Sequence, residues 1–132
     1  MIMKTVVETI SRVLISPRSY DERATLLWSG SLIMSGICPA GIGRVGFPLH
    51  ILEHAISVSG DIAHGAGLSA LMPGWLLANK NRIEDRLCRL GHLLIDEKTE
   101  NSAPSASDTI RYITHFLDSI KCPLCLEDIG VG

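Results

Sequence analysis

Apolar side chains recur three or four residues apart along nearly the whole chain of 132 residues, and no stretch predicts a strand. This spacing places the apolar positions on one face of each helix, so the pattern predicts an all-α fold, a bundle of about six helices. The first four expected helices are residues 3–16, about 20–36, about 48–59 and 62–79. The last two are expected to begin at the caps Asn81 and Asp108.

Turn-forming residues predict how these helices are interrupted. Ser19 or Asp21 is the expected cap of the second helix, because a short polar side chain accepts from the free N–H groups of a helix start. Pro73 is expected to kink the fourth helix or to break it into two pieces. The loop 37–47 is rich in glycine, so we expect it to be flexible and to approach a ligand closely.

Length and composition predict one helical domain, residues 1–132, whose core includes Trp28 and Trp75. The formal net charge is −2, which argues against electrostatic binding to nucleic acid or to an anionic membrane surface. The uncharged stretch Ala24–Gly43 has the length of a membrane span, but it contains three serines, four glycines and Pro39. Its more apolar part, Ala24–Met34, is too short to span a bilayer, so we expect a buried helix there, with a membrane span as the alternative.

The four cysteines include one close pair, Cys122 and Cys125. A redox pair of this spacing needs a strand before it and a helix after it, and a structural zinc site needs a second close pair. Here the pair follows a helix and the other two cysteines are isolated, so chance spacing is the expected explanation. The start of the chain lacks the apolar core of a signal peptide, which predicts a cytoplasmic protein with reduced thiols.

Three of the five histidines, His50, His54 and His64, lie within fifteen residues on apolar helical ground. Neutral imidazole is the commonest side-chain ligand for a transition metal. His50 and His54 share one helix face, whereas an unbroken helix would place His64 about 21 Å from His50. A reversal at Gly60, with Asp61 as the next N-cap, would return His64 in the first turn of a second helix, where the helix dipole keeps imidazole neutral. The spacing alone leaves open that these histidines are satisfied core residues.

The same stretch matches the inverted zinc-protease pattern H-x-x-E-H. In that interpretation both histidines bind zinc, Glu53 activates a water molecule, and Glu127 supplies a distant third ligand. So short a pattern often occurs by chance. If it does not apply, Glu53 is expected to be a solvated or hydrogen-bonded helix residue.

A longer pattern explains more of the sequence. It consists of two histidines four residues apart, a third histidine followed by glycine, and an apolar run that ends in proline; its members here are His50, His54, Ile56, Ser57, His64, Gly65, Leu68, Ser69 and Pro73. This string resembles the histidine signature of iron-dependent (group III) alcohol dehydrogenases. The flanking segments 20–24 and 115–130 are similar to segments of that family and occur in the same order.

The resemblance implies the all-helical, metal-binding C-terminal domain of an NAD(P)-linked alcohol dehydrogenase or aldehyde reductase. It makes His50 and His64 ligands of a divalent metal, Fe²⁺ or Zn²⁺. It places His54 beside the nicotinamide, as a cofactor-binding residue with a catalytic role in proton transfer. In such enzymes the metal polarises the oxygen of a small alcohol or aldehyde, and hydride passes to or from NAD(P).

Two parts of the family's pattern do not occur in these 132 residues: the Asp-x-x-x-His pair that supplies the other metal ligands, and the Gly-rich phosphate turn. We therefore expect a C-terminal catalytic fragment that is inactive alone. The alternative is a non-enzymatic helical interaction module, or a degenerate fragment, that docks on a full-length homologue. Apolar faces are expected to support a homo-oligomer or docking on a nucleotide-binding domain; no nucleic-acid or membrane partner is expected.

Overall fold

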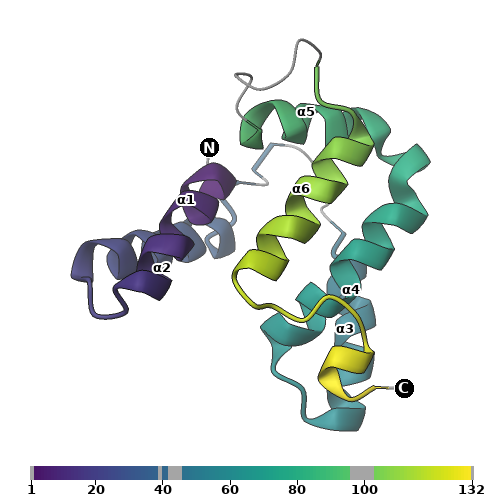
Figure 1. Ribbon diagram of the computed structural model, residues 1–132, viewed down its shortest axis with the longest axis horizontal. Helices are drawn as coiled ribbons and strands as arrows, with labels where there is room; N and C mark the ends of the chain where they lie inside the picture. The colour runs from purple at the N-terminus through teal and green to yellow at the C-terminus, as the bar shows by residue number, and fades with distance from the viewer. Residues whose placement is uncertain (1, 39, 42–45, 96–102, 132) are drawn as a thin grey trace. The chain divides into compact units, whose positions relative to one another are not determined.

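The computed structural model describes residues 2–38, 40–41, 46–95 and 103–131 (Figure 1). Within these ranges the chain forms six α-helices, two short 3₁₀ turns and no strand, which confirms the all-α prediction. The helices are α1 (Ile2–Ile15), α2 (Tyr20–Met34), α3 (Pro48–Gly60), α4 (His64–Asn79), α5 (Glu84–Leu94) and α6 (Ala106–Ser119), with 3₁₀ turns η1 (Lys80–Arg82) and η2 (Glu127–Ile129). Part of the expected loop 37–47, including Pro39 and Gly43, lies outside the described residues.

The contacts divide the chain into two compact units, Met1–Gly46 and Phe47–Gly132. In the first unit α1 packs against α2, and the buried side chains there are small and polar, Thr9 and Ser29. An ion pair between Arg12 and Glu22 also joins the two helices, with 3.8 Å between the Arg12 Nε and a Glu22 carboxylate oxygen.

The expectation of a buried helix with Trp28 in the core is wrong for α2. Leu27 and Trp28 expose 74% and 66% of their surfaces. The apolar residues of α2 are distributed around the helix rather than on one stripe, so a single interface with α1 leaves most of them open. Among the described residues, no helix is both long enough and apolar enough to cross a bilayer.

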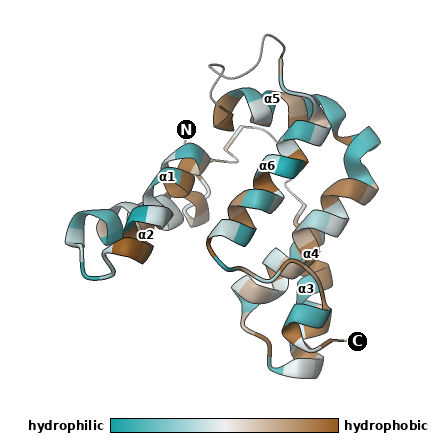
Figure 2. Ribbon diagram, in the orientation of Figure 1, coloured by the Kyte–Doolittle hydropathy of each residue, from teal (hydrophilic) through white to brown (hydrophobic). Residues whose placement is uncertain are grey.

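The second unit holds the apolar core. Helix α5 packs on α6, and α6 also contacts α4 (Figure 1). The buried core residues come from these three helices: Leu76, Leu87, Ala106, Ile110 and Ile113. Trp75 packs against this cluster, as expected. Figure 2 shows polar and apolar segments alternating along α6, the pattern of a helix with one buried face.

The close approach of α5 and α6 depends on Gly91. A Cβ atom at this position would overlap the hydroxyl oxygen of Thr109 and lie 2.9 Å from the Cβ of Pro104. Thr109 is fully buried, and its hydroxyl lies 2.9 Å from the carbonyl oxygen of Leu87 and 3.0 Å from that of Ser105, either of which accepts its proton. A residue without a side chain is therefore needed where these helices meet.

Several predicted helix ends differ from those observed. Ser105, not Asp108, caps α6: its hydroxyl accepts from the Asp108 N–H at 3.2 Å, and Asp108 accepts from the Ser105 N–H at 3.0 Å. This reciprocal pair is a capping box, in which an acidic residue three positions inside the helix is easily mistaken for the cap. Asn81 lies inside η1, so Ile83 precedes α5 instead.

The remaining expectations for the caps and the proline also have clear outcomes. Ser19 is the residue that precedes α2, although its side chain does not cap the backbone and donates to Glu22 instead. Pro73 lies inside α4 without dividing it into two helices.

Candidate metal centre

The reversal between α3 and α4 occurs where the sequence predicts it. Gly60 is the last residue of α3, and Asp61 adopts the left-handed conformation with φ of 49°. The N–H of Asp61 donates to the carbonyl oxygen of Ser57 at 3.1 Å, which closes the helix end. The expectation that Asp61 caps α4 is wrong, because it ends α3 instead; aspartate is one of the few residues that tolerate this conformation.

This reversal brings three imidazole rings together. His50 and His54 lie one turn apart on α3, and His64 is the first residue of α4. The ring centre of His64 lies 5.2 Å from that of His50 and 5.3 Å from that of His54. The predicted meeting of residues 50 and 64 across the turn is therefore confirmed, and His54 joins them.

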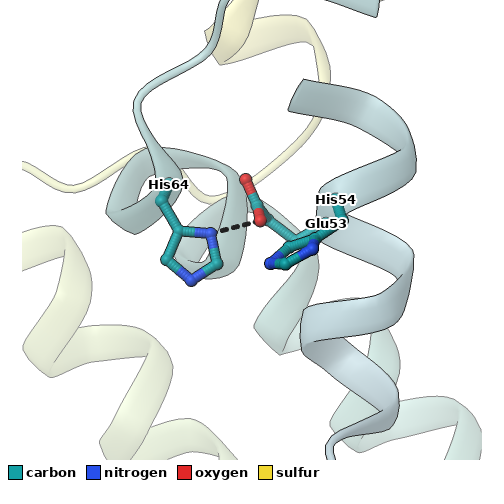
Figure 3. A group of neighbouring side chains, drawn as sticks. All are labelled: Glu53, His54 and His64. Carbon is teal, nitrogen blue, oxygen red and sulfur yellow. Dashed lines mark hydrogen bonds and ion pairs between the residues drawn. The ribbon is translucent and has the colours of Figure 1, made fainter. Parts of the chain in front are cut away.

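Glu53 lies on the buried side of α3 and directs its carboxylate toward the ring of His64 (Figure 3), whereas all three histidines are exposed. Its side chain has no exposed surface. One carboxylate oxygen contacts the Nδ1 of His64, and the other accepts from the Ser57 hydroxyl. Of the two states expected for Glu53, the hydrogen-bonded one is right and the solvated one is wrong.

The electrostatics of the site keep the Glu53 carboxylate charged. The hydrogen bond from Ser57 has the largest effect and lowers the pKa of Glu53, whereas burial opposes this shift. The hydrogen bond and charge of His64, and the charge of His54, lower the same pKa further. The buried acid is therefore an anion at neutral pH that faces imidazole nitrogen atoms.

Sequence reasoning missed the glycine that makes room for Glu53. A Cβ atom on Gly67 would lie 2.8 Å from the Cγ of Glu53, so α4 approaches α3 this closely only with glycine at that position. The available signal was the spacing, because Gly67 follows His64 by three residues and therefore shares its face of α4.

The donor atoms of Glu53, His54 and His64 lie within 4.8 Å of one another, close enough to converge on one ion (Figure 3). Imidazole nitrogen and carboxylate oxygen are ligands that Zn²⁺ and Fe²⁺ accept. The residues present therefore fit a transition metal, with His50 next to this group through its ring contact with His64. The other two histidines, His92 and His115, are exposed on α5 and α6.

Comparison with known proteins identifies the family of the chain. The profile of the Fe-containing alcohol dehydrogenase family, C-terminal, matches residues 1–132. The chain belongs to this family. It is 30% identical over 117 residues to NADH-dependent butanol dehydrogenase A of Clostridium acetobutylicum, covering 86% of this chain and 29% of that protein. It is 26% identical over 132 residues to an NADPH-dependent aldehyde reductase of Escherichia coli, covering 98% of this chain and 33% of that protein.

The fold is shared with solved members of the family. The crystal structure of NADH-dependent butanol dehydrogenase A from Thermotoga maritima matches with a TM-score of 0.86 and 26% identity, over 99% of this chain and 33% of that one. The chain thus spans about a third of the length of the curated relatives it matches. The predicted resemblance and fold class are both confirmed.

The inverted-protease interpretation has no support in the site. Glu127 lies exposed in η2, and it is not among the described residues whose donor atoms cluster with Glu53. All four cysteines are free, so the Cys122 and Cys125 pair forms no disulfide.

Proposed function

We propose that this chain is the metal-binding helical domain of an NAD(P)-linked alcohol dehydrogenase or aldehyde reductase. Both units are parts of one functional domain in this proposal. The observation that carries the proposal is the convergence of three imidazoles at the α3–α4 reversal in a chain of the Fe-containing alcohol dehydrogenase family. The names of its relatives, butanol dehydrogenases and an aldehyde reductase, support small alcohols and aldehydes as the substrate class.

In this proposal His50 and His64 hold the divalent metal, Fe²⁺ or Zn²⁺, across the reversal. A bound metal ion supplies Lewis acidity to the substrate oxygen, and the nicotinamide accepts or donates hydride. His54 lies one turn from His50 on the exposed side of α3 and is available to hold or pass a proton beside the cofactor. Two imidazoles leave much of the coordination sphere to other ligands, so further ligands from the complete enzyme are part of the proposal.

A transplant experiment tests the proposed activity. The 132-residue chain replaces the matching third of NADH-dependent butanol dehydrogenase A of Clostridium acetobutylicum, and oxidation of NADH with butanal is followed spectrophotometrically. We expect turnover by the chimaera, loss of at least about a hundredfold in His50→Ala or His64→Ala, and unchanged turnover in His92→Ala. A chimaera that is folded and binds both NADH and Zn²⁺ but does not turn over would contradict the proposal.

The isolated chain provides the complementary measurement. It is expected to show no turnover with alcohols and NAD(P), because the Gly-rich phosphate turn of the family does not occur in these 132 residues. Zn²⁺ binding measured by calorimetry should depend on His50 and His64 but not on His92. Dehydrogenase activity of the purified 132-residue chain would contradict this expectation.

A second candidate is a helical module that docks on another protein. The observation that favours it is the exposure of Leu27 and Trp28 on α2, since large exposed apolar side chains are typical of docking surfaces. Light scattering of the isolated chain separates the two functions. Self-association that Trp28→Ser removes and His64→Ala preserves supports the module; a monomer that still binds Zn²⁺ supports the metal-binding domain alone.

A further inference from the structure

Glu53 of α3 is fully buried, and both oxygens of its carboxylate have hydrogen-bond partners. Its carboxylate is inaccessible to solvent, and each oxygen has its own partner, Ser57 on one side and the Nδ1 of His64 on the other. A Cβ atom added at Gly67 of α4 would lie 2.8 Å from the Glu53 side chain, so the glycine leaves the space that this side chain fills. Burial of a carboxylate is unfavourable unless its hydrogen bonds are satisfied, so these contacts are what keep the side chain in place.

The contact with His64 determines which ring nitrogen faces outward. A neutral imidazole carries one N–H and one lone pair, and the partner of one nitrogen decides where the proton resides. Because Glu53 occupies the Nδ1 side, the Nε2 of His64 is the ring nitrogen that points away from Glu53 (Figure 3), and the His64 side chain as a whole is half-exposed. Metal-binding histidines usually donate their second N–H to a carboxylate or carbonyl group in this way.

We propose that Glu53 is a positioning residue that accepts the Nδ1–H of His64, so that the lone pair of Nε2 points toward the metal. This inference rests on the proposed function, which makes His64 a metal ligand. The alternative is that Glu53 itself binds the ion, since its oxygen lies within 4.8 Å of the donor atoms of His54 and His64. The buried carboxylate with both oxygens already paired favours the positioning role.

Ser57 and Gly67 complete the arrangement from opposite helices. The Ser57 hydroxyl lies one turn beyond Glu53 on α3, and it also comes within 3.3 Å of the carbonyl oxygen of Ile62 in the turn. The single proton of this hydroxyl therefore has two possible acceptors, one in the site and one in the reversal that returns the chain to His64. Orientation of His64 and closure of the α3–α4 turn are thus built from the same few contacts.

The first experiment measures the tautomer of His64 without any metal. Long-range ¹H–¹⁵N correlation spectra are recorded on the ¹⁵N-labelled 132-residue chain with a chelator at about pH 8, where an ordinary histidine is neutral. We expect the proton of His64 on Nδ1 in the wild type and a mixture of both tautomers in Glu53→Gln. A wild-type His64 that carries its proton on Nε2 would overturn the proposal.

The second experiment measures Zn²⁺ affinity by calorimetry on the same proteins. Glu53→Gln should bind Zn²⁺ about 10- to 100-fold more weakly than the wild type, as for loss of a partner behind a ligating histidine. The matched control is Glu84→Gln, which alters an exposed acid of α5 and should leave the affinity unchanged. Complete loss of binding, as severe as in His64→Ala, would mark Glu53 as a ligand; unchanged affinity and tautomer in a folded Glu53→Gln chain would exclude any positioning role.

Ser57→Ala keeps the test informative if Glu53→Gln does not fold. It removes only the hydroxyl that holds the far oxygen of Glu53, so we expect a smaller shift of the His64 tautomer and of Zn²⁺ affinity in the same direction. No change in either measurement would contradict the proposal. The two hypotheses also fail separately: a wild-type chain that binds no Zn²⁺ contradicts the metal site, whereas the metal-free spectra judge the Glu53 contact on their own.

Discussion

Two helical hairpins of the second unit, α3–α4 and α5–α6, pack in the same way. In each, a buried glycine lies where the helices approach, and a Cβ atom there would strike a buried polar side chain of the other helix. Gly67 faces Glu53 in the first hairpin, and Gly91 faces Thr109 in the second. In both cases the polar group is fully buried and fully hydrogen-bonded.

The two hairpins differ in what satisfies the buried group. The Thr109 hydroxyl uses backbone carbonyl groups, which are part of the helices themselves. The Glu53 carboxylate uses the side chains of His64 and Ser57. A neutral hydroxyl bound to backbone only joins two helices, whereas an anion bound to an imidazole also orients a side chain at the surface. The comparison therefore contrasts a hairpin whose buried polar group is bound by backbone with one whose buried polar group contacts the side chains of the candidate site.

The largest expected effect is on the stability of the α5–α6 hairpin. Leu87 is 3% exposed in the core, so Leu87→Ala should reduce the free energy of unfolding by about 3 kcal/mol through lost burial and a residual cavity. Urea denaturation followed by circular dichroism measures this change. Leu93→Ala, on the exposed side of the same helix, should change it by about 0.5 kcal/mol or less. Equal effects of the two variants would show that α5–α6 is not the stabilising hairpin.

Gly91→Ala tests the packing of α5 on α6 directly. The added methyl group would overlap the Thr109 hydroxyl, and we expect a loss of about 1–3 kcal/mol in unfolding free energy from overpacking. This loss exceeds the gain of about 1 kcal/mol that alanine brings to an open helix position. Gly74→Ala in α4 is the matched control, since its Cβ would meet no atom within 4 Å, and it should be neutral or stabilising. Thermal unfolding of the two variants decides between these outcomes.

Gly67→Ala should affect the site more than the stability. Its methyl group would displace the Glu53 side chain, and a displaced carboxylate no longer holds His64, so we expect Zn²⁺ affinity to fall about tenfold. The loss of stability should be smaller than for Gly91→Ala, because the longer side chain of Glu53 can shift by bond rotation, whereas the short Thr109 side chain and the Pro104 ring cannot. Calorimetry on Gly65→Ala, whose Cβ would meet open space beside the same histidine, supplies the control. Equal affinities in the two variants would argue against the distinction between the hairpins.

The smallest expected effect concerns the capping box of α6. Ser105→Ala should cost about 1 kcal/mol of unfolding free energy through loss of the cap. The hydroxyl of Ser105, then its backbone N–H, lower the pKa of Asp108. A carboxyl whose folded pKa lies below its unfolded value stabilises the fold above the unfolded value, about 3.9 for aspartate, and loses this contribution as the pH falls through the folded value.

Stability measured between about pH 7 and about pH 3 should therefore fall less steeply in Ser105→Ala than in the wild type. Ser107→Ala, on the exposed side of the same first turn, should keep the wild-type pH dependence. A parallel pair of curves for Ser105→Ala and the wild type would contradict the assigned cause of the Asp108 pKa shift.

Local pattern was sufficient for the helices and for part of the site. Helix periodicity placed α1 and α3 within about one residue of their observed bounds, because an amphipathic face depends only on nearby residues. The spacing of His50 and His54 and the stop at Gly60 likewise predicted the meeting with His64. Caps were less predictable: Asp61 ends one helix rather than starting the next, and such choices depend on left-handed backbone angles that residue type alone does not determine.

The sequence by itself determined that this chain is helical, that it reverses after Gly60, and that it carries the histidine pattern of its family. Only the tertiary structure decided that Trp28 lies open to solvent while Glu53 lies fully buried. Burial depends on which surfaces meet, and those surfaces come from residues distant along the chain, such as Gly67 opposite Glu53. The role proposed for Glu53 therefore depends on that meeting of helices rather than on its own place in the pattern.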